Sequence, residues 1–538
     1  MRKFSVLISG RFVTGLLYLA FLSLVCCQNP VSKQQPVVRD SIPEEDVPVR
    51  GFFSDQKKLQ LDSITLDSFF KKYGQLKNYE SDVKKFYGYR HFLYAWFDVN
   101  GLNEQASNLL NLLNNLDKEG IRATIPYKEM VDSIMNDPAQ SGMPDSEIEI
   151  LLSAEYFFYG DKVWNGISEK ETKKLEWMLP RKKLDLPYLM DSLLKENPSN
   201  FNSGYYNIRQ YNLLKTNLEK YRRLDGMNDW EFLKASVKPP KKNDSSELIS
   251  KIRHRLYLLG DLSTDSRSNE FDDDLEKGIS RFQVRYGMKS DGVPGPDFFR
   301  EINISPQENI RKLIVNMERT RWMPIELSQH YIIVNIPAFT LSAFDKDTLT
   351  LRMNVVVGKD VHKTVIFNGD IKYIVFSPYW NIPPSIMKKE ILPAIRKNPD
   401  YLTKNNMEWA GNGIRQKPGP KNSLGLVKFL FPNSYNIYLH DSPAKSLFGA
   451  QSRAFSHGCI RLSEPKKLAA YLLKDDSSWT EEKIQQAMTG GKEKYVTLKN
   501  PVPVYIGYLT AWVDNEGRLN FRNDVYKRDD ALENMIVK

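Results

Sequence analysis

The chain has 538 residues, more than one hydrophobic core usually organises, and this length predicts about three domains. A hydrophobic content of 41% and an aromatic content of 12% indicate globular domains and exclude a chain that is disordered throughout. The net charge of +10 is compatible with a polyanionic partner, but the basic residues are spread along the chain and form no arm of the kind that binds nucleic acid.

The N-terminus has the features of an export signal. The basic opening MRK precedes an apolar run over residues 12–25, which is short for a membrane span of about 20 residues. Leu24 stands three residues before Cys27, as in a lipobox, so we expect residues 1–27 to be a signal peptide and Cys27 to be lipidated. An uncleaved signal anchor is the alternative. Both interpretations predict an exported, periplasmic protein held at a membrane, which argues against a nucleic-acid partner.

Residues 28–48 are polar, contain proline and lack periodicity, so we expect a linker there. Residues 49–237 show helical periodicity and predict a helical N-terminal scaffold domain. One amphipathic stripe in this domain is formed by Ala106, Leu109, Leu110, Leu113 and Leu116. The aromatic run FYGYRHFLYAWFD, which contains His91, is typical of a core and not of a ligand site. We find no catalytic motif in this part of the chain.

Residues 245–303 follow the linker KPPKKND and predict a small helical domain. The run FDDDLEKGISRFQVRYGMKSDGVPG has Gly292 and Gly295 in the turn before the last helix, and it resembles the three-helix peptidoglycan-binding domain of bacterial wall enzymes. The resemblance implies binding to peptidoglycan glycan, and a generic helical hairpin is the alternative. A further helix over residues 304–327 is expected to connect this domain to the next.

The periodicity changes to two near residue 328, so we expect a mainly β domain over residues 328–530. Apolar residues alternate on both sides of the turn DKDT and predict two strands that contain Ile332, Val334 and Ile336, then Leu349, Leu351, Met353, Val355 and Val357. The basic insertion over about 385–422 is long for a loop in a compact domain, so we expect a lid over a binding site.

Cys459 is the candidate for chemistry in this domain. Apart from the adjacent Cys26 and Cys27 it is the only cysteine, and an exported thiol without a disulfide partner is either buried or used. The strand NIYLH ends at His440, and a helix is expected after Cys459 with Ser463 as its N-cap, a position that favours a thiolate. An inert buried cysteine and a zinc site with two histidines remain as alternatives, although no second close ligand pair supports zinc.

A catalytic cysteine needs a base within hydrogen-bond reach and donors for a developing oxyanion. His457 is only two residues from Cys459, which makes it a poor base in an extended segment, whereas His440 is better placed on a neighbouring strand. The backbone N–H groups of Gly458 and Cys459 are the expected oxyanion donors, because glycine lets the backbone approach a substrate closely.

The motif SHGCIR at residues 456–461, together with His440, resembles the signature of L,D-transpeptidases with a YkuD-type catalytic domain. The segments FSPYWNIP and RAFSHGCIRLSEP resemble the multi-domain YcbB-like branch, and the likeness covers most of residues 80–530. The resemblance implies that Cys459 is the nucleophile, that His440 is the general base, and that the backbone carbonyl of Asp441 orients the imidazole. It also implies that Ser456 and His457 shape the loop, with His457 as a secondary participant. Substrate contacts are expected for Arg461, Arg415, Trp380 and Ser456. The alternative for Arg461 is a structural ion pair at the start of the following helix. No metal or other cofactor is implied.

We therefore expect a multi-domain α+β fold with a helical N-terminal scaffold, a small three-helix wall-binding domain and a mainly β YkuD-type catalytic domain with a lid insertion. The resemblance implies a peptidoglycan L,D-transpeptidase that forms 3-3 cross-links between stem peptides through a cysteine thioester, and that carbapenem-type inhibitors acylate. The alternatives are an L,D-carboxypeptidase, a cysteine endopeptidase acting on peptidoglycan, and a non-enzymatic wall-anchoring protein that uses only residues 245–303.

Overall fold

The computed structural model describes most of the chain, namely residues 59–98, 101–182, 184–195, 208–324, 327–346 and 348–536. The expected signal peptide and the linker after it lie outside the described residues. Within these ranges, no helix combines the length and the apolar character that a membrane crossing requires.

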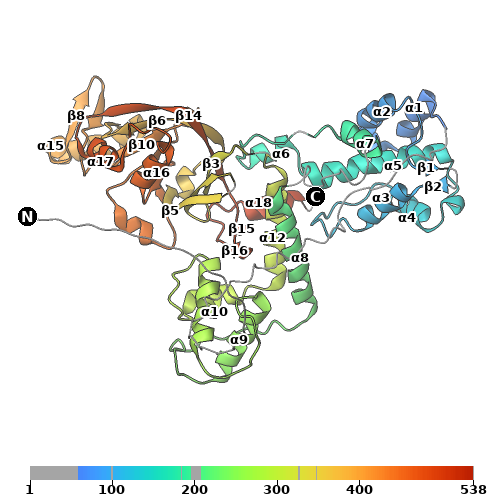
Figure 1. Ribbon diagram of the computed structural model, residues 1–538, viewed down its shortest axis with the longest axis horizontal. Coiled ribbons are helices and arrows are strands. Elements are labelled where there is room, and N and C mark those ends of the chain that lie inside the picture. The colour runs from blue at the N-terminus through green and yellow to red at the C-terminus, as the bar shows by residue number, and fades with distance from the viewer. Residues whose placement is uncertain are drawn as a thin grey trace, which may run out of the picture. The chain divides into compact units, whose positions relative to one another are not determined.

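The scaffold region is helical, as predicted (Figure 1). Its elements are α1 (Ser63–Lys72), α2 (Glu80–Tyr89), β1 (Phe97–Asp98), β2 (Gly101–Leu102), α3 (Glu104–Asn114), α4 (Lys128–Asn136), α5 (Asp145–Gly160), α6 (Glu169–Lys174) and α7 (Leu186–Lys195). All five residues of the predicted stripe are buried. Every residue of α5 from Ile148 to Gly160 is also buried, so this helix is the centre of the scaffold core.

Residues 245–303 fold into three helices, α9 (Glu247–Leu259), α10 (Asp273–Arg285) and α11 (Pro296–Ile302). Ser246 and Asp272 cap the first two, because their side-chain oxygens accept from backbone N–H groups of the first turn. The apolar faces of the three helices share one core with α8 (Arg209–Gly226) and with the strands β15 (Ala511–Val513) and β16 (Leu519–Phe521). The core of this module is therefore continuous with segments that are distant in sequence.

A buried ion pair lies in this shared core. Two nitrogens of Arg285 donate to the Asp261 carboxylate at 2.8 and 2.5 Å, and a third donates to the Leu519 carbonyl at 2.6 Å. The two charged side chains are 6% and 2% exposed. Because the pair is bidentate and fully hydrogen-bonded, it joins α10 to β16 in one defined geometry.

Helix α12 (Pro306–Arg321) occupies the segment predicted to connect the domains. Ser305 and Glu308 form a capping box around its first turn, with Pro306 at the first helical position. Its last turn buries charged side chains in place of apolar ones, because Glu318, Arg319 and Arg321 are each at most 2% exposed. Their partners come from several other segments of the chain.

The C-terminal domain is built on a sheet with the strand order β12-β5-β13-β11-β10-β6-β14-β3-β4. Since β4 also pairs with β5, eight of the described strands close into a ring. The strands are β3 (His330–Asn335), β4 (Thr340–Asp345), β5 (Thr348–Gly358), β6 (Asn368–Phe376), β10 (Val427–Leu430), β11 (Leu439–His440), β12 (Ala454–Ser456), β13 (Ile460–Leu462) and β14 (Lys494–Gly507). Helices α16 (Pro465–Leu472), α17 (Glu481–Thr489) and α18 (Asp529–Ile536) contribute apolar residues to its core.

The predicted alternation of apolar residues holds for most of the first strands of this domain. Six of the predicted residues are buried, namely Ile332, Val334, Ile336, Met353, Val355 and Val357. Leu349 is 36% exposed and Leu351 is half-buried, so the core prediction is wrong at the start of β5. The exposed start belongs to the part of β5, residues 348–354, that pairs with β4, whereas residues 355–358 pair with β12 and β13.

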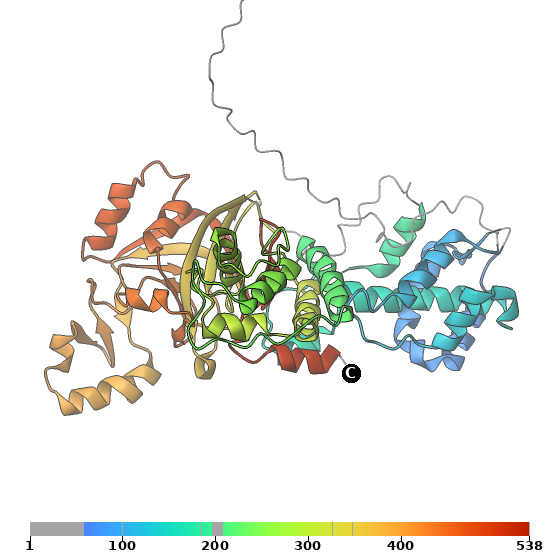
Figure 2. The same cartoon turned by 90° about the horizontal axis from the view of Figure 1, so that it is seen from below.

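The predicted lid is a folded lobe and not a long loop (Figure 2). Strands β7 (Trp380–Asn381), β8 (Met407–Ala410) and β9 (Gly413–Gln416) form a separate sheet, which is accompanied by α13 (Pro384–Ile386), α14 (Leu392–Lys397) and α15 (Tyr401–Lys404). Ile382, Ile391 and Ile414 form its small core. Gly411 adopts a φ of 58° in the turn of the β8–β9 hairpin, and the sequence AGNG is a local hairpin signal for this turn.

We expect the substitution Asp261→Asn to lower the free energy of unfolding of the shared core by about 3–5 kcal/mol, because it leaves the Arg285 charge buried without a counter-charge. Hydrogen exchange of residues 511–521, together with urea denaturation, measures this loss. The control Asp274→Asn removes an exposed carboxylate that pairs with Lys277 at 3.8 Å and should change stability by less than about 1 kcal/mol. Equal protection in the two variants would contradict the role of the buried pair.

Candidate active site

Two neighbouring parallel strands place four polar side chains together. The register of β11 and β13 pairs Leu439 with Ile460, and these residues are fully buried. Successive side chains of a strand point to opposite faces, so the residues on either side of this pair share the other face. These residues are His440 and Arg461, within β11 and β13, and Tyr438 and Cys459, each of which directly precedes its strand. The fold therefore brings the predicted nucleophile, the predicted base and a guanidinium to one surface.

His440 is held by a backbone carbonyl, as the family resemblance implies. Its Nδ1 lies 2.5 Å from the carbonyl oxygen of Asp441, so Nδ1 carries the hydrogen and Nε2 keeps its lone pair in the neutral ring. The Asp441 carboxylate is occupied elsewhere, because it accepts from the backbone N–H groups of Leu426 and Ser442 and from Lys445. Burial and the nearby Arg461 charge lower the pKa of His440 to about 4. The imidazole is neutral at pH 7 and can accept a proton.

Cys459 lies in the bend between β12 and β13 and does not stand next to a helix. Strand β13 separates the thiol from α16, and the N-cap of α16 is Glu464, so the expected N-cap at Ser463 is wrong. Burial raises the pKa of the Cys459 thiol, and hydrogen bonding to Tyr438 and the Arg461 charge only partly oppose this effect. The predicted lowering of the thiol pKa is therefore also wrong for this structure.

The thiol and the imidazole form a neutral pair at rest. Their residues are diagonal neighbours on adjacent strands, and strand spacing and rise place their Cα atoms on the order of 8 Å apart. The thiol donates to the carbonyl of Asn436 at 3.7 Å, while the imidazole donates to Asp441. Transfer of the thiol proton to Nε2 of His440 thus requires rotation of the Cys459 side chain away from Asn436.

Ser456 shapes the loop before the nucleophile. Its buried hydroxyl donates to the Cys459 carbonyl at 2.6 Å and accepts from the Gly458 N–H at 3.1 Å. The Gly458 N–H is therefore already engaged, and the prediction that it donates to an oxyanion is not supported in this geometry. Glycine is required here for another reason, because Gly458 has a φ of 113°, which L side chains rarely adopt. The buried position of Ser456 also speaks against the predicted substrate contact.

A second network supports the same loop from outside the motif. The hydroxyl of Thr364 donates to the Gly458 carbonyl at 2.8 Å and accepts from the N–H of Gly358 at 2.9 Å. Tyr526 donates to the Gly358 carbonyl at 2.6 Å and accepts from the N–H of Thr364 at 3.2 Å. In a trans peptide the C=O and the following N–H point in opposite directions. The bond to the Gly458 carbonyl therefore aims the Cys459 N–H away from Thr364.

Tyr438 is a site residue that sequence analysis missed. Burial and the neighbouring Cys459 thiol raise the pKa of its phenol. Its ring centroid is 5.7 Å from that of His440. The pattern YLH, in which Tyr438 and His440 are two residues apart on a strand, is the signal that could have identified it.

Arg461 has a charge that no carboxylate neutralises among the described residues, since no ion pair joins it and its buried Nε has no hydrogen-bond partner. The alternative interpretation, a structural ion pair at the start of the helix, is therefore not supported. Burial lowers the pKa of Arg461, and the neighbouring Cys459 thiol opposes that effect. An uncompensated guanidinium beside the thiol is suited to a substrate carboxylate.

His457 points toward the lid. Its Nε2 is 3.5 Å from the Glu390 carboxylate, and its ring lies 5.1 Å from that of His362. Burial lowers the pKa of His457 although Glu390 opposes this shift. The contact with Glu390 brings the loop that carries Cys459 next to the lid.

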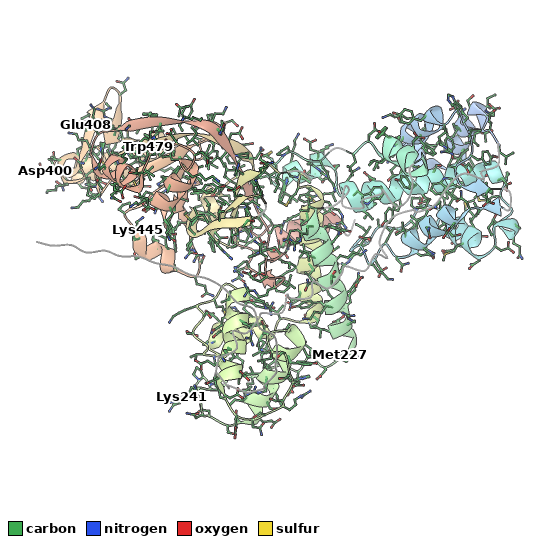
Figure 3. The ribbon with its side chains drawn as sticks, viewed as in Figure 1. Met227, Lys241, Asp400, Glu408, Lys445 and Trp479 are labelled. Carbon is green, nitrogen blue, oxygen red and sulfur yellow. The ribbon has the colours of Figure 1, made fainter. Side chains whose placement is uncertain are left out.

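Arg415 and Trp380 lie in the lid. Arg415 donates to Glu408 at 2.8 and 2.7 Å and stacks 4.2 Å from the Tyr379 ring, so its charge is compensated within the lid. Trp380 packs half-buried against the small core around Ile391. Glu408, which also pairs with Lys417, is labelled in Figure 3. The contacts of both residues described here are made within the lid, and their predicted substrate contacts stay predictions.

No set of three or more His, Cys, Asp or Glu side chains is arranged to hold a metal ion in the part of the chain that the structure describes. A thiol, a neutral imidazole, a phenol and a guanidinium are the groups available for chemistry at this site. Together they suit nucleophilic acyl transfer, in which a thiol attacks a carbonyl and an imidazole accepts its proton.

Three family models match the chain. The model of the YkuD family, described as "L,D-transpeptidase catalytic domain", matches residues 329–504. One described as "Scaffold domain" matches residues 81–218, and one described as "Putative peptidoglycan binding domain" matches residues 245–302. Among curated proteins, the "Putative L,D-transpeptidase" of Haemophilus influenzae is 31% identical over 250 residues, which cover 42% of this chain and 50% of that protein. The chain thus spans about half the length of the curated relative that it matches.

Solved structures overlap with the chain only weakly. An L,D-transpeptidase from Mycobacterium smegmatis is 14% identical, with 33% of this chain and 58% of that chain covered and a TM-score of 0.20. An L,D-transpeptidase from Stackebrandtia nassauensis is 13% identical, with 50% and 97% covered and a TM-score of 0.22. An L,D-transpeptidase in complex with imipenem is 15% identical, with 33% and 59% covered and a TM-score of 0.20. At these TM-scores the overlaps support no argument.

The catalytic family model and the curated relative both indicate an L,D-transpeptidase. This agrees with the chemistry that the side chains at β11 and β13 can support. The match to the catalytic model contains His440, the SHGC loop and the whole lid. The chain therefore carries an L,D-transpeptidase catalytic domain of the YkuD family together with a peptidoglycan-binding domain.

Proposed function

We propose that the protein is a peptidoglycan L,D-transpeptidase that forms 3-3 cross-links between stem peptides through a thioester on Cys459. The observation that carries this proposal is the shared face of β11 and β13, where the thiol, His440, Tyr438 and Arg461 meet inside a YkuD domain. The substrate class follows from the accompanying peptidoglycan-binding domain.

In the first step, Nε2 of His440 accepts the thiol proton as Sγ attacks the carbonyl of the third stem residue, a diamino acid. The new C–S bond forms, and the C–N bond to the terminal D-alanine breaks once His440 returns the proton to the leaving amine. Since both groups are neutral at rest, general-base catalysis fits the pair better than a preformed thiolate.

The negative charge that develops on the carbonyl oxygen needs donors. The N–H of Cys459 has no hydrogen-bond partner among the described residues, and the Thr364 bond fixes its direction. The Tyr438 hydroxyl neighbours the thiol and can supply a second donor when it turns from the sulfur to the carbonyl oxygen. These two groups replace the expected pair of backbone donors. Arg461 is suited to hold the free carboxylate of the diamino acid.

In the second step, the side-chain amine of a neighbouring stem attacks the thioester and gives its proton to His440. The amide forms, the C–S bond breaks, and the thiol is restored with that proton. Water in place of the amine would make the protein an L,D-carboxypeptidase. A cysteine endopeptidase would use the same side chains on an existing cross-link, and a wall-anchoring protein would need none of them.

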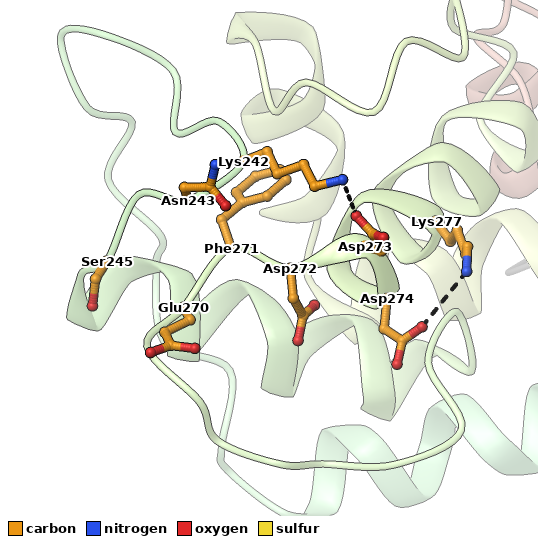
Figure 4. A pocket seen from close by; sticks show the side chains of 9 residues that line it. All are labelled: Lys242, Asn243, Ser245, Glu270, Phe271, Asp272, Asp273, Asp274 and Lys277. Carbon is orange, nitrogen blue, oxygen red and sulfur yellow. Dashed lines mark ion pairs between the residues drawn. The ribbon is translucent and has the colours of Figure 1, made fainter.

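The peptidoglycan-binding module offers a hollow for glycan. A cavity of about 720 Å³ is lined by nine residues, Lys242, Asn243, Ser245, Glu270, Phe271, Asp272, Asp273, Asp274 and Lys277 (Figure 4). Two ion pairs line it, Lys242 with Asp273 and Lys277 with Asp274. Asn243, Ser245 and Glu270 add hydrogen-bonding side chains to the same hollow. We propose that sugar hydroxyl and amide groups bind there.

We also propose export to the periplasm with lipidation of Cys27, on the basis of the N-terminal sequence alone. Carbapenem-type inhibitors are proposed as acylating ligands of Cys459, because a strained β-lactam carbonyl can replace the donor amide.

Purified muropeptides that end in a tetrapeptide test the proposed reaction. With the full-length chain we expect dimers joined 3-3 and released D-alanine, and with Cys459→Ala we expect neither. A carbapenem should add its mass to the wild-type protein and not to Cys459→Ala, as intact-protein mass spectrometry measures. Circular dichroism verifies that the variant is folded. Trimmed monomers without dimers would instead assign a carboxypeptidase, and cleavage of existing dimers would assign an endopeptidase.

The pKa of His440 predicts the pH dependence of acylation. The imidazole accepts a proton only when it is unprotonated, so the acylation rate should be level from pH 5 to pH 8 and fall as pH drops through about 4. His440→Ala should lower the rate at pH 7 by about 100- to 10,000-fold and restore part of it at alkaline pH, where solvent ionises the thiol. An inflection between pH 6 and 7 in the wild-type protein would contradict the neutral pair.

Point variants test the hollow of the wall-binding module, because removal of residues 245–303 would open the core shared with β15 and β16. We expect the double variant Asn243→Ala/Glu270→Gln to weaken sedimentation with sacculi about fivefold, through loss of one or two hydrogen bonds. The control Lys289→Gln changes an exposed residue of the same module outside the hollow. Unchanged sacculus binding of the double variant would refute this glycan site.

A further inference from the structure

A second cavity, of about 540 Å³, lies between the peptidoglycan-binding module and the start of β5. Four arginines line it, namely Arg300, Arg352, Arg453 and Arg522. Asp297 is the single carboxylate among the lining residues, and it pairs with Arg300 at 2.5 Å. The other three guanidinium groups face a cavity that contains no free counter-charge of its own.

The hydrogen bonds of these arginines are made to neutral groups. Arg453 donates to the carbonyls of Ala450, at 2.9 Å, and Phe339, at 3.2 Å, and its buried Nε has no partner. Arg522 donates to the carbonyls of Arg285 and Phe521 at 2.5 and 2.6 Å. Carbonyl groups satisfy the donors but leave the positive charges uncompensated.

The three charges repel one another. Burial and the charges of Arg352 and Arg453 together lower the pKa of Arg522 to about 9, although Asp514 opposes them. Arg352 is exposed on β5, and its side chain makes no hydrogen bond or ion pair with any described residue. An anion in the cavity would relieve this repulsion, and Arg352 is free to contact it.

The cavity is connected to the active site by one strand. Arg352 stands near the start of β5, and Gly358 at its end lies against Gly458, because a Cβ built on Gly358 would be 3.1 Å from the Cα of Gly458. Six residues of extended strand span roughly 20 Å at about 3.3 Å per residue. The cavity and the thiol loop thus lie at opposite ends of this stretch, where two neighbouring stems can occupy them together.

We propose that this cavity binds a carboxylate of a peptidoglycan stem peptide adjacent to the one that reacts at Cys459. Stem peptides carry free carboxylates, and a guanidinium group binds a carboxylate through paired hydrogen bonds. The site would give the protein a preference for polymeric peptidoglycan with several stems over a single muropeptide. The identity of the ligand rests on the proposed function. The excess positive charge of the cavity is independent of that function.

Binding to the full-length Cys459→Ala protein tests the proposal without turnover. The probes are glycan fragments with several tetrapeptide stems, a single disaccharide tetrapeptide, the same fragments with amidated carboxylates, and inorganic pyrophosphate. We expect Arg352→Gln to raise the Kd for fragments with several stems about tenfold and to leave the Kd for the single stem within about twofold. Amidated fragments should bind both proteins alike, and the difference should shrink as salt screens the charges.

The control Lys372→Gln removes an exposed positive charge from β6 of the same sheet and should change neither affinity. If neither Arg352→Gln nor Arg352→Glu weakens binding of fragments with several stems, the proposal is wrong. If pyrophosphate binding depends on Arg352, and native and amidated fragments bind with equal affinity, the ligand of the cavity is a phosphate and not a stem carboxylate.

This test is separable from that of the catalytic proposal. Arg352→Gln with Cys459 intact should cross-link single-stem substrates at the wild-type rate, since Arg352 lies outside the thiol site. If acylation at Cys459 does not occur, the proposed reaction is wrong. That reaction would then not explain an Arg352-dependent affinity. Failure of the affinity difference, with acylation intact, would refute only the second cavity.

Discussion

The buried charges at the C-terminal end of α12 are the constraint on which the rest of the described structure depends. Arg319 pairs with Asp529 at 2.6 Å, and Arg321 pairs with Glu318 at 2.7 Å while it donates to the Glu119 carbonyl. These partners come from the scaffold and from the end of the chain. Removal of one member of a buried pair costs about 3–5 kcal/mol, and charged hydrogen bonds are directional in a way that apolar packing is not. One helix turn therefore defines how several segments meet.

The catalytic site depends on strand register in a comparable way. A shift of one residue between β11 and β13 would turn Cys459 or His440 toward the core, where Leu439 and Ile460 now lie. The loop before the nucleophile is fixed from two sides, by the hydroxyl of Ser456 and by Thr364. Rigid backbone around a neutral thiol and imidazole suits an enzyme whose proton transfer begins only when a substrate turns the thiol toward its base.

Local sequence patterns predicted the elements of the fold but not its closure. Helical stripes, caps and strand alternation depend on neighbours within a few residues, which is why α3, α9 and β3 were predictable. The pairing of β4 with β5, the core shared between the module and β15, and the exposed Leu349 depend on contacts between distant residues. The same holds for the site, because SHGC and His440 are local motifs, whereas Tyr438 and the raised thiol pKa follow from register and burial.

Tyr526 gives the catalytic loop a dependence on the order in which the chain is made. This residue lies beyond residue 504, where the catalytic family model ends, yet it holds Thr364 and Gly358, which in turn support Gly458. Synthesis delivers a chain from its N-terminus, so Cys459 emerges well before the residue that completes its surroundings. The thiol can reach its final geometry only when almost the whole chain has been made, after residues 245–303 have already emerged.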